Sequence, residues 1–192
     1  KTYDLAAPPL GERDCDFTFP DSTPTELIVD YMSLSNLGVP VVQTGGTIND
    51  ASCLNKTAIY GIVRVTREDD IKTALAVAEA NNLTITPAGE RHSMGGQSFS
   101  KGGLVLDMHG LNTISVDVEN LTMTVGSGAT WKEVQAVLDP LGLAVKAMQS
   151  INLFTVGGTI SVNAHGIEHN PGQIGPTIRS LRVMLADGTI KR

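Results

Sequence analysis

From residue 58 onward, apolar positions follow strand and helix periodicities in turn. The run IYGIVRV at 59–65 predicts a strand, apolar residues at helical spacing predict a helix over 67–81, and LTITP at 83–87 predicts a second strand. Thr66 and Asp69 resemble a capping box at the start of that helix. The three segments together predict a βαβ unit.

Turn signals separate the elements that follow. A glycine-rich loop at 88–103 leads into a predicted strand at 104–108. The segments ISVDV and LTMTV predict a hairpin over 114–125 that turns at Glu119–Asn120. A capping-box pattern then opens a second helix, predicted over 130–138.

The last part of the chain predicts shorter elements. A strand is expected near 143–147, a helix after the Gly157–Gly158 turn, and a long strand over 178–186. Asp187–Gly188 is a hairpin turn signal, but only residues 189–192 remain to form the returning strand. We therefore expect the chain to be truncated relative to its natural domain.

The N-terminal part lacks the regular alternation of strands and helices that begins at residue 58. Residues 1–22 show no periodicity and predict an extended arm, and Thr23 is the predicted N-cap of a helix that ends near Gly38. Cys15 and Cys53 are too few and too far apart for a metal knuckle. Whether they form a disulfide stays open.

Composition narrows the classes of function. With 192 residues, 41% of them hydrophobic, the chain can bury a substantial core. A net charge of -6 offers no basic surface for nucleic acid. The sequence has neither a membrane-length apolar run nor a signal segment, and its start at Lys1 indicates trimming or processing. Compartment and oligomeric state stay unassigned.

The first candidate site is PAGERHSMGGQS at 87–98, directly after a predicted strand. Gly89, Gly95 and Gly96 would let backbone N–H groups turn inward and bind an anion such as a pyrophosphate. His92 lies within this loop. The alternative is an ordinary glycine-rich surface loop.

The second candidate is FTVGGTISVNAHG at 154–166. Gly157–Gly158 at a helix start would direct backbone donors at one place, and the small residues Ser161 and Ala164 would let a flat ligand lie close. The alternative is a tight turn into a core helix. Two donor-rich glycine loops in one domain suit a dinucleotide.

Other site classes fit the residues less well. Gly126-Ser127-Gly128 leaves a hairpin strand rather than opening a dinucleotide-binding helix, and Trp131 occupies the third small position of that pattern. HGIEH at 165–169 fits a zinc-peptidase pattern, but Gly166 and the breaker run 170–172 oppose a helix there. A zinc hydrolase and a non-catalytic binding domain remain as alternatives.

Four ordered motifs and the segment after them carry a family resemblance. They are INDASCLN (48–55), TPAGERHSMGGQSF (86–99), VGSGATW (125–131), FTVGGTISVNAHG (154–166) and IGPTIRSLRVMLADG (174–188). Together they resemble the FAD-binding domain of the vanillyl-alcohol oxidase or p-cresol methylhydroxylase (PCMH-type) superfamily. The sequence looks closest to the branch of sugar, alditol and aldonolactone oxidases and decaprenylphosphoryl ribose oxidases.

The resemblance implies an α+β fold of the PCMH type with two lobes. An N-terminal arm and helix at 1–47 would precede a small βαβ lobe at 48–110. A larger lobe of mixed or antiparallel sheet with helices would follow at 111–192, truncated at the C-terminus. The substrate cap domain of the family would be absent.

The resemblance also implies FAD as cofactor, covalently bound through His92 in the GERHS loop. No cysteine lies near 148–157, so a second flavin link is not expected. His165 is the candidate catalytic residue, with a structural histidine as the alternative. The residues expected to bind FAD are Ala88, Gly89, Glu90, Arg91, His92, Ser93, Met94, Gly95, Gln97, Ser98, Ser150, Thr155, Gly157, Gly158, Val162, His165 and Gly166.

The implied activity is oxidation of a CH–OH group in a small alcohol, sugar or aldonolactone. The substrate would deliver hydride to flavin N5, since the cofactor carries the redox step. The catalytic base is expected in the missing cap, so the fragment by itself would be inactive.

Overall fold

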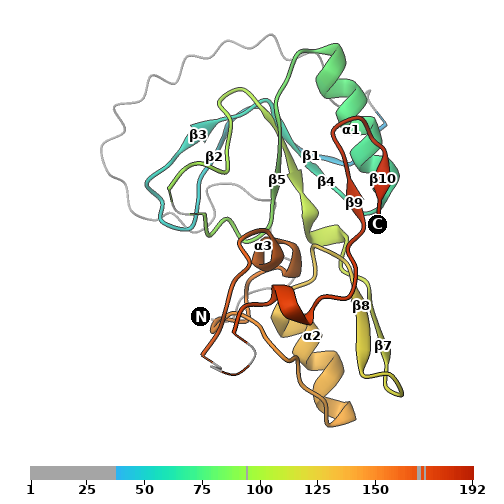
Figure 1. Ribbon diagram of the computed structural model, residues 1–192. Coiled ribbons are helices and arrows are strands. Elements are labelled where there is room, and N and C mark those ends of the chain that lie inside the picture. Colours follow the sequence, from blue (N-terminus) through green and yellow to red (C-terminus); the bar gives the residue numbers. More distant parts are fainter. Residues whose placement is uncertain (1–37, 94, 168–169, 171) are drawn as a thin grey trace. The chain divides into compact units, whose positions relative to one another are not determined.

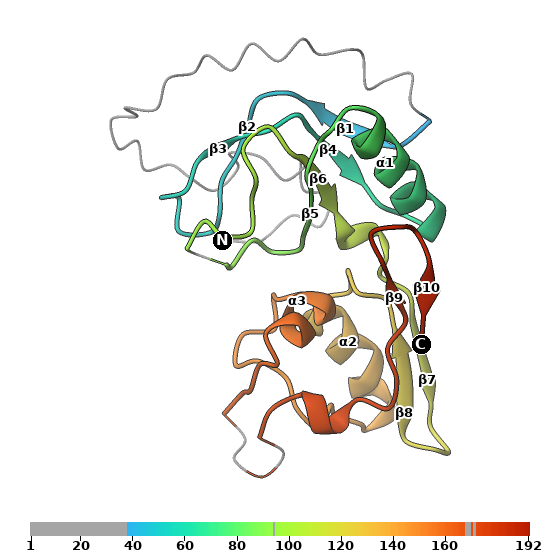
Figure 2. The same ribbon diagram turned by 45° about the horizontal axis from the view of Figure 1, so that its top comes forward.

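The computed structural model describes residues 38–192 apart from 94, 168–169 and 171 (Figures 1 and 2). The helix predicted to begin at Thr23 lies outside the described residues. The chain divides into two compact units, of which the first ends at Asp107 and the second begins at Met108. Each unit combines helices with sheet, which confirms the α+β prediction.

The first unit is built on a four-stranded sheet with the order β1-β4-β6-β5. β1 runs antiparallel to β4, whereas β6 lies parallel to both β4 and β5. Its strands and helix are β1 (Val41–Thr44), β4 (Gly61–Arg64), α1 (Glu68–Ala80), β5 (Ile85–Ala88) and β6 (Leu104–Asp107). A separate small hairpin pairs β2 (Thr47–Ile48) with β3 (Thr57–Ala58).

The predicted βαβ unit is present as β4-α1-β5, but its two strands are not neighbours. β6 lies between them (Figure 2), and all four of its residues are buried. A continuous apolar run is typical of a strand covered on both faces. The adjoining core contains Ile48, Ile59, Ile62, Ala88, Phe99 and Val105.

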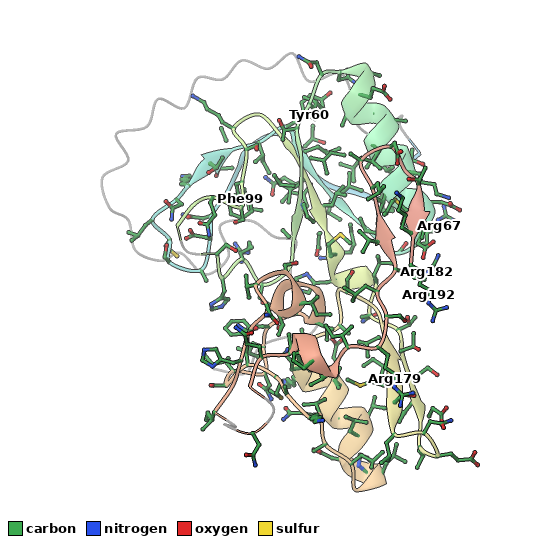
Figure 3. The ribbon with its side chains drawn as sticks, viewed as in Figure 1. Tyr60, Arg67, Phe99, Arg179, Arg182 and Arg192 are labelled. Carbon is green, nitrogen blue, oxygen red and sulfur yellow. The ribbon has the colours of Figure 1, made fainter. Side chains whose placement is uncertain are left out.

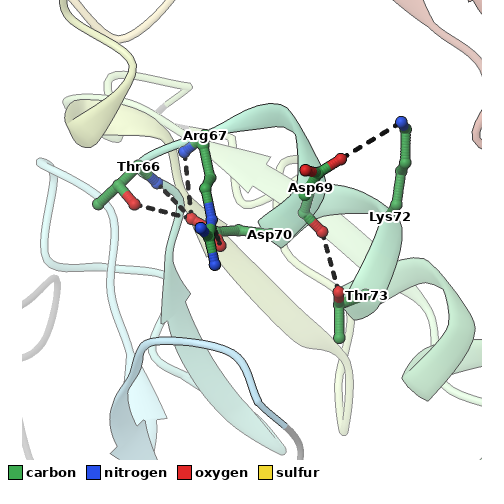
Figure 4. Close-up of polar contacts among 6 residues, drawn as sticks. All are labelled: Thr66, Arg67, Asp69, Asp70, Lys72 and Thr73. Carbon is green, nitrogen blue, oxygen red and sulfur yellow. Dashed lines mark hydrogen bonds and ion pairs between the residues drawn. The ribbon is translucent and has the colours of Figure 1, made fainter.

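The cap of α1 differs from its prediction. Because the helix begins at Glu68, Asp70 rather than Asp69 reaches back to the chain before it. The Asp70 carboxylate accepts hydrogen bonds from the backbone and side chains of Thr66 and Arg67 (Figure 4). Asp69 instead forms an exposed ion pair with Lys72.

The second unit contains the predicted hairpin and helices. The Thr130–Glu133 capping box is confirmed, as is the turn that joins the last two strands. The elements are η2 (Met108–Gly110), β7 (Ile114–Asp117), β8 (Thr122–Val125), α2 (Trp131–Leu138), η3 (Asp139–Leu141), α3 (Val156–Ser161), η4 (Gly175–Thr177), β9 (Val183–Met184) and β10 (Ile190–Lys191).

Two strand predictions for this unit are wrong. Residues 143–147 form no strand, because Leu143 and Val145 pack against the Trp131 core rather than pair with another strand. The strand predicted over 178–186 is reduced to β9, since only Val183 and Met184 pair with β10.

A polar network crosses the core of the second unit. The indole N–H of Trp131 donates to Thr159 Oγ1 at 2.8 Å, and that hydroxyl donates to Gln149 Oε1 at 2.6 Å. Trp131 and Thr159 are buried, so the network satisfies groups that water does not reach. It connects α2, α3 and the segment before α3.

Within the described residues, none of the helices has the length and apolar character that a membrane crossing requires.

Replacement of Asp70 by alanine should lower the free energy of unfolding by about 1–2 kcal/mol, as loss of a helix cap does. Burial raises the pKa of Asp70, but the hydrogen bonds from Thr66 and Arg67 outweigh it and hold the pKa below 3.8. The bonds therefore contribute fully above the unfolded pKa of about 3.9 and less as pH falls through the folded value.

Urea unfolding of wild type and Asp70→Ala from pH 7 downward measures this contribution. The difference between the two proteins should shrink in acid. A difference that stays constant down to the acid unfolding of the wild type would contradict the assignment.

Candidate functional site

The glycine-rich loop is held at both ends by the core of the first unit. Ala88, the last residue of β5, and Phe99, just beyond the loop, are both buried. Phe99 is labelled in Figure 3. Between Ala88 and Phe99, His92, Gly95 and Gln97 are exposed. Both ends of the loop are therefore fixed in the core, and its middle is exposed to solvent. Met94, which was predicted to bind FAD, lies outside the described residues.

The imidazole of His92 is poised toward its neutral form. Its pKa lies below 6.5, chiefly because the ring is partly desolvated, and the Arg91 cation lowers it further. The negative charges of Glu90 and Asp50 act in the opposite direction. A neutral imidazole retains a nitrogen lone pair, which formation of a covalent bond requires.

A turn at residues 49–55, called here the 49–55 turn, holds the loop next to His92. Arg91 Nη1 donates to the carbonyl of Asn49 at 2.7 Å, and the carbonyl of Arg91 accepts from the Ala51 N–H at 3.0 Å. Arg91 itself has a φ of 58°, in the left-handed region. These two bonds offset the cost of that conformation immediately before His92.

Asp50 is the centre of the 49–55 turn, and its exposure is 0%. Its carboxylate accepts from the N–H and hydroxyl of Ser52, from Asn55 Nδ2 at 2.6 Å, and from the N–H of Gly96 in the loop. Burial raises the pKa of Asp50, but these bonds outweigh it and hold the pKa below 3.8. A buried anion therefore joins the turn to the loop.

Gly96 completes this junction. Its φ is 74°, and a Cβ at this position would lie 2.7 Å from Asn55 Oδ1. The Asn55 side chain has little freedom to move aside, since it donates to Asp50. The sequence motif INDASCLN contributes to the family resemblance, but only the structure shows that Asn49, Asp50 and Asn55 support the loop.

The sequence left open whether Cys15 and Cys53 form a disulfide, and Cys53 lies in this turn. Cys53 is disulfide-bonded and has a φ of 60°. Cys15 lies outside the described residues.

The loop has a polar atom that a cofactor would satisfy. The hydroxyl oxygen of Ser98 is buried and has no hydrogen-bond partner among the described residues. A buried hydroxyl without a partner is costly, so a further polar group is expected to meet it. Together with the exposed residues around His92, this fits a phosphate-bearing cofactor at the loop.

The second candidate loop, in the second unit, differs from its prediction in one respect. The α3 helix begins at Val156 as expected, but its first N–H groups are already used. Gly157 N–H donates to the Ser127 carbonyl at 2.8 Å, and Gly158 N–H to Thr155 Oγ1 at 3.3 Å. The expectation that these two donors are available for a ligand is therefore wrong.

The glycines of the second unit instead permit close backbone packing. A Cβ on Gly157 would lie 2.8 Å from the Ser127 carbonyl oxygen. Likewise, a Cβ on Gly126 or Gly128 would clash with the backbone carbonyl of Leu111 or Met108. The motifs VGSGATW and FTVGGT thus fit together through their backbones.

The remaining predicted residues of this unit lie on both sides of α3, and three of them follow its C-terminal end. Val162 is 66% exposed, His165 is exposed, and Gly166 is half-buried. The ring Nδ1 of His165 lies 3.1 Å from the Gly166 carbonyl oxygen, a contact that fits the structural alternative for this histidine. Ser150 is exposed in the loop before α3, whereas Thr155 is buried as its N-cap.

The zinc pattern lacks its helix. α3 ends at Ser161, and His165 follows in an isolated bridge with Gln173. Glu168 and His169 lie outside the described residues. Among the residues that are described, no group of His, Cys, Asp or Glu side chains could hold a metal ion.

Among curated relatives, the uncharacterized oxidoreductase ORF5 of the fasciation locus of Rhodococcoides fascians is 32% identical over 123 residues. The decaprenylphosphoryl-beta-D-ribose oxidase of Mycolicibacterium smegmatis is 29% identical over the same length. The matches cover 64% and 63% of this chain, which spans only 28% and 27% of these relatives.

A solved structure has the same fold. A variant of BBE-like 1 from Physcomitrella patens aligns with a TM-score of 0.66 at 20% identity, over 72% of this chain and 31% of that protein. The family model described as FAD binding domain matches residues 59–192, which include both candidate loops. The PCMH-type resemblance is confirmed, and the chain belongs to the FAD binding domain family.

Proposed function

We propose that this chain is the FAD-binding part of an oxidoreductase that oxidises a CH–OH group in an alcohol, sugar or aldonolactone. The observation that carries the FAD assignment is the 88–98 loop, which joins an exposed His92 to the buried hydroxyl of Ser98, for which the described part of the chain offers no hydrogen-bond partner. Membership of the FAD binding domain family supports the same cofactor.

The proposed substrate class is supported by the names of similar proteins. One of them is named as an oxidase of decaprenylphosphoryl-beta-D-ribose, and another as an oxidoreductase. Since this chain spans less than a third of either relative, the residues that bind substrate would lie partly in other segments of the full-length protein.

In the first unit, we assign the 88–98 loop to the cofactor. Ser98 would donate to a polar group of FAD, and the backbone around Gly89 and Gly95 would follow its pyrophosphate. His92 would carry the covalent bond to the 8α-methyl carbon of the flavin, because its depressed pKa keeps a nitrogen lone pair available at neutral pH. In that bond formation a C–H bond of the methyl group would be broken, its proton would be lost to solvent, and its two electrons would reduce the flavin itself, which oxygen or another acceptor would then reoxidise.

In the second unit, we assign the segment around the end of α3. Val162 offers an exposed apolar side chain against which a flat ring can lie. His165 and Gly166 would lie beside the same ring, with His165 also the candidate to contact substrate. Bound FAD would supply the redox chemistry as the hydride acceptor.

The overall proposal is tested on the full-length protein. We expect it to be purified with a visible flavin spectrum and to turn over some of a panel of alditols, aldonolactones and sugars, with oxygen or an artificial acceptor. A colourless protein with stoichiometric zinc would overturn the proposal.

His92→Ala tests the covalent assignment. Wild-type protein should retain its flavin through acid precipitation, whereas the variant should release essentially all of it into the supernatant. The flavin content of each fraction is measured by absorbance. If wild type and variant release equal amounts, His92 does not hold the flavin covalently.

Ser98→Ala tests the fit of the loop to the cofactor. Flavin-free variant protein should be more stable than flavin-free wild type by about 1 kcal/mol, since a buried unsatisfied hydroxyl is removed. Made in the His92→Ala background, where FAD would bind reversibly, the substitution should lower the affinity for FAD about fivefold or more, because a hydrogen bond to the cofactor is lost.

Thr86→Val is the matched control. Thr86 Oγ1 is also buried without a hydrogen-bond partner among the described residues, but Thr86 lies in β5 and is not assigned to FAD. This variant should also gain stability and should bind FAD like wild type. Equal loss of affinity in both variants would contradict a specific role for Ser98.

A further inference from the structure

The 49–55 turn has no part in the cofactor site as assigned, yet it contacts the 88–98 loop on both sides of His92. On one side, the two hydrogen bonds between the turn and Arg91 fix the residue that precedes the histidine. On the other side, Gly96 donates to the Asp50 carboxylate. His92 thus lies in a short segment of the loop that is hydrogen-bonded to the 49–55 turn both before and after the histidine.

Asp50 is costly to bury, and its local bonds alone do not explain its position. A serine or asparagine could receive the donors of the turn without the desolvation cost of a full charge. The carboxylate additionally reaches the loop through Gly96, where no side chain would fit beside Asn55. Its negative charge also acts on the His92 ring, together with Glu90 and against Arg91.

We propose that Asp50 is the positioning residue of the 88–98 loop: its buried carboxylate anchors Gly96, while the bonds from the same turn to Arg91 fix the loop on the other side of His92. The inference rests on the proposed function, because the loop matters as the part of the chain that carries FAD. Asp50 itself contacts the loop backbone and is not assigned to the cofactor.

Asp50→Asn is the first test, made in the full-length protein. An amide keeps one acceptor oxygen but presents an NH2 group where the carboxylate accepted a donor. Hydrogen–deuterium exchange of peptides covering 89–98 should become about tenfold faster, as loss of a charge-assisted bond predicts. The fraction of covalently attached flavin should fall severalfold.

The pH profile separates positioning from general loss of structure. Attachment requires neutral His92, and Asp50 raises the pKa of this ring. Removing the anion should therefore move the pH of half-maximal flavin attachment to a lower value, while Glu90 and Arg91 remain. A merely structural defect would lower the yield and leave this pH unchanged.

Asp70→Asn is the matched control. Asp70 is another buried carboxylate of the same unit that accepts several hydrogen bonds, but its partners are Thr66 and Arg67 at the start of α1 (Figure 4). Exchange should become faster in α1 and stay at the wild-type rate in 89–98. Equal acceleration of the loop in both variants would overturn the proposal.

Gly96→Ala approaches the same junction from the loop. The added Cβ would collide with Asn55 at a left-handed φ, while Asp50 keeps its charge. Loop exchange should rise as in Asp50→Asn, and wild-type exchange in either variant would overturn the proposal. If wild type itself holds no covalent flavin, the covalent assignment fails, and loop exchange still decides the role of Asp50.

Discussion

Because an ionised carboxylate removed from water must be matched by donors, each buried aspartate of the first unit determines how the chain nearby is arranged. Asp107 at the end of β6 pairs with Arg64 at the end of β4, with 2.8 Å between carboxylate and guanidinium. Asp70 accepts hydrogen bonds from the residues that lead into α1, and Asp50 accepts them from the 49–55 turn. The apolar sheet forms the core, and these buried carboxylates determine the path of the segments that connect its strands.

The described residues of the second unit include no buried charged side chain, and its polar groups are matched in other ways. Its loops approach each other closely enough that Gly126, Gly128 and Gly157 cannot carry a side chain. Backbone donors that a ligand could have used are used between loops instead, and the Trp131 network satisfies the polar groups of the core. The exposed residues left for a ligand are side chains at the end of α3.

Local patterns in the sequence were sufficient for the elements that are decided locally. Both long helices, the β7–β8 hairpin and the last turn follow from periodicity, capping residues and turn residues. Pairing over long distances was not predictable in this way. β1 is a four-residue strand whose partner lies about twenty residues away along the chain, and no pattern indicates that β6 enters between β4 and β5. The apolar run at 143–147 resembles a strand because packing against a helix requires the same residues.

The candidate site also combines residues that the sequence indicates with contacts that only the folded chain creates. The sequence alone was enough to single out His92 and its glycine loop as a candidate, because residue types and spacing are visible in it. The support from Asp50 could not be recognised in this way, because an aspartate in a turn is common and its burial depends on the loop that folds over it. The commitment of the Gly157 N–H to Ser127 likewise depends on a contact between segments that are separated in sequence.

The position of β6 has a consequence for how the protein is made. As the chain leaves the ribosome, β4, α1 and β5 emerge first, but the two strands have no hydrogen-bonding partner in each other. The 88–98 loop must then emerge in full before β6 can enter the gap. Until that moment both strand edges stay open to other chains. The length of the 88–98 loop thus also sets how long the nascent sheet remains prone to mispairing.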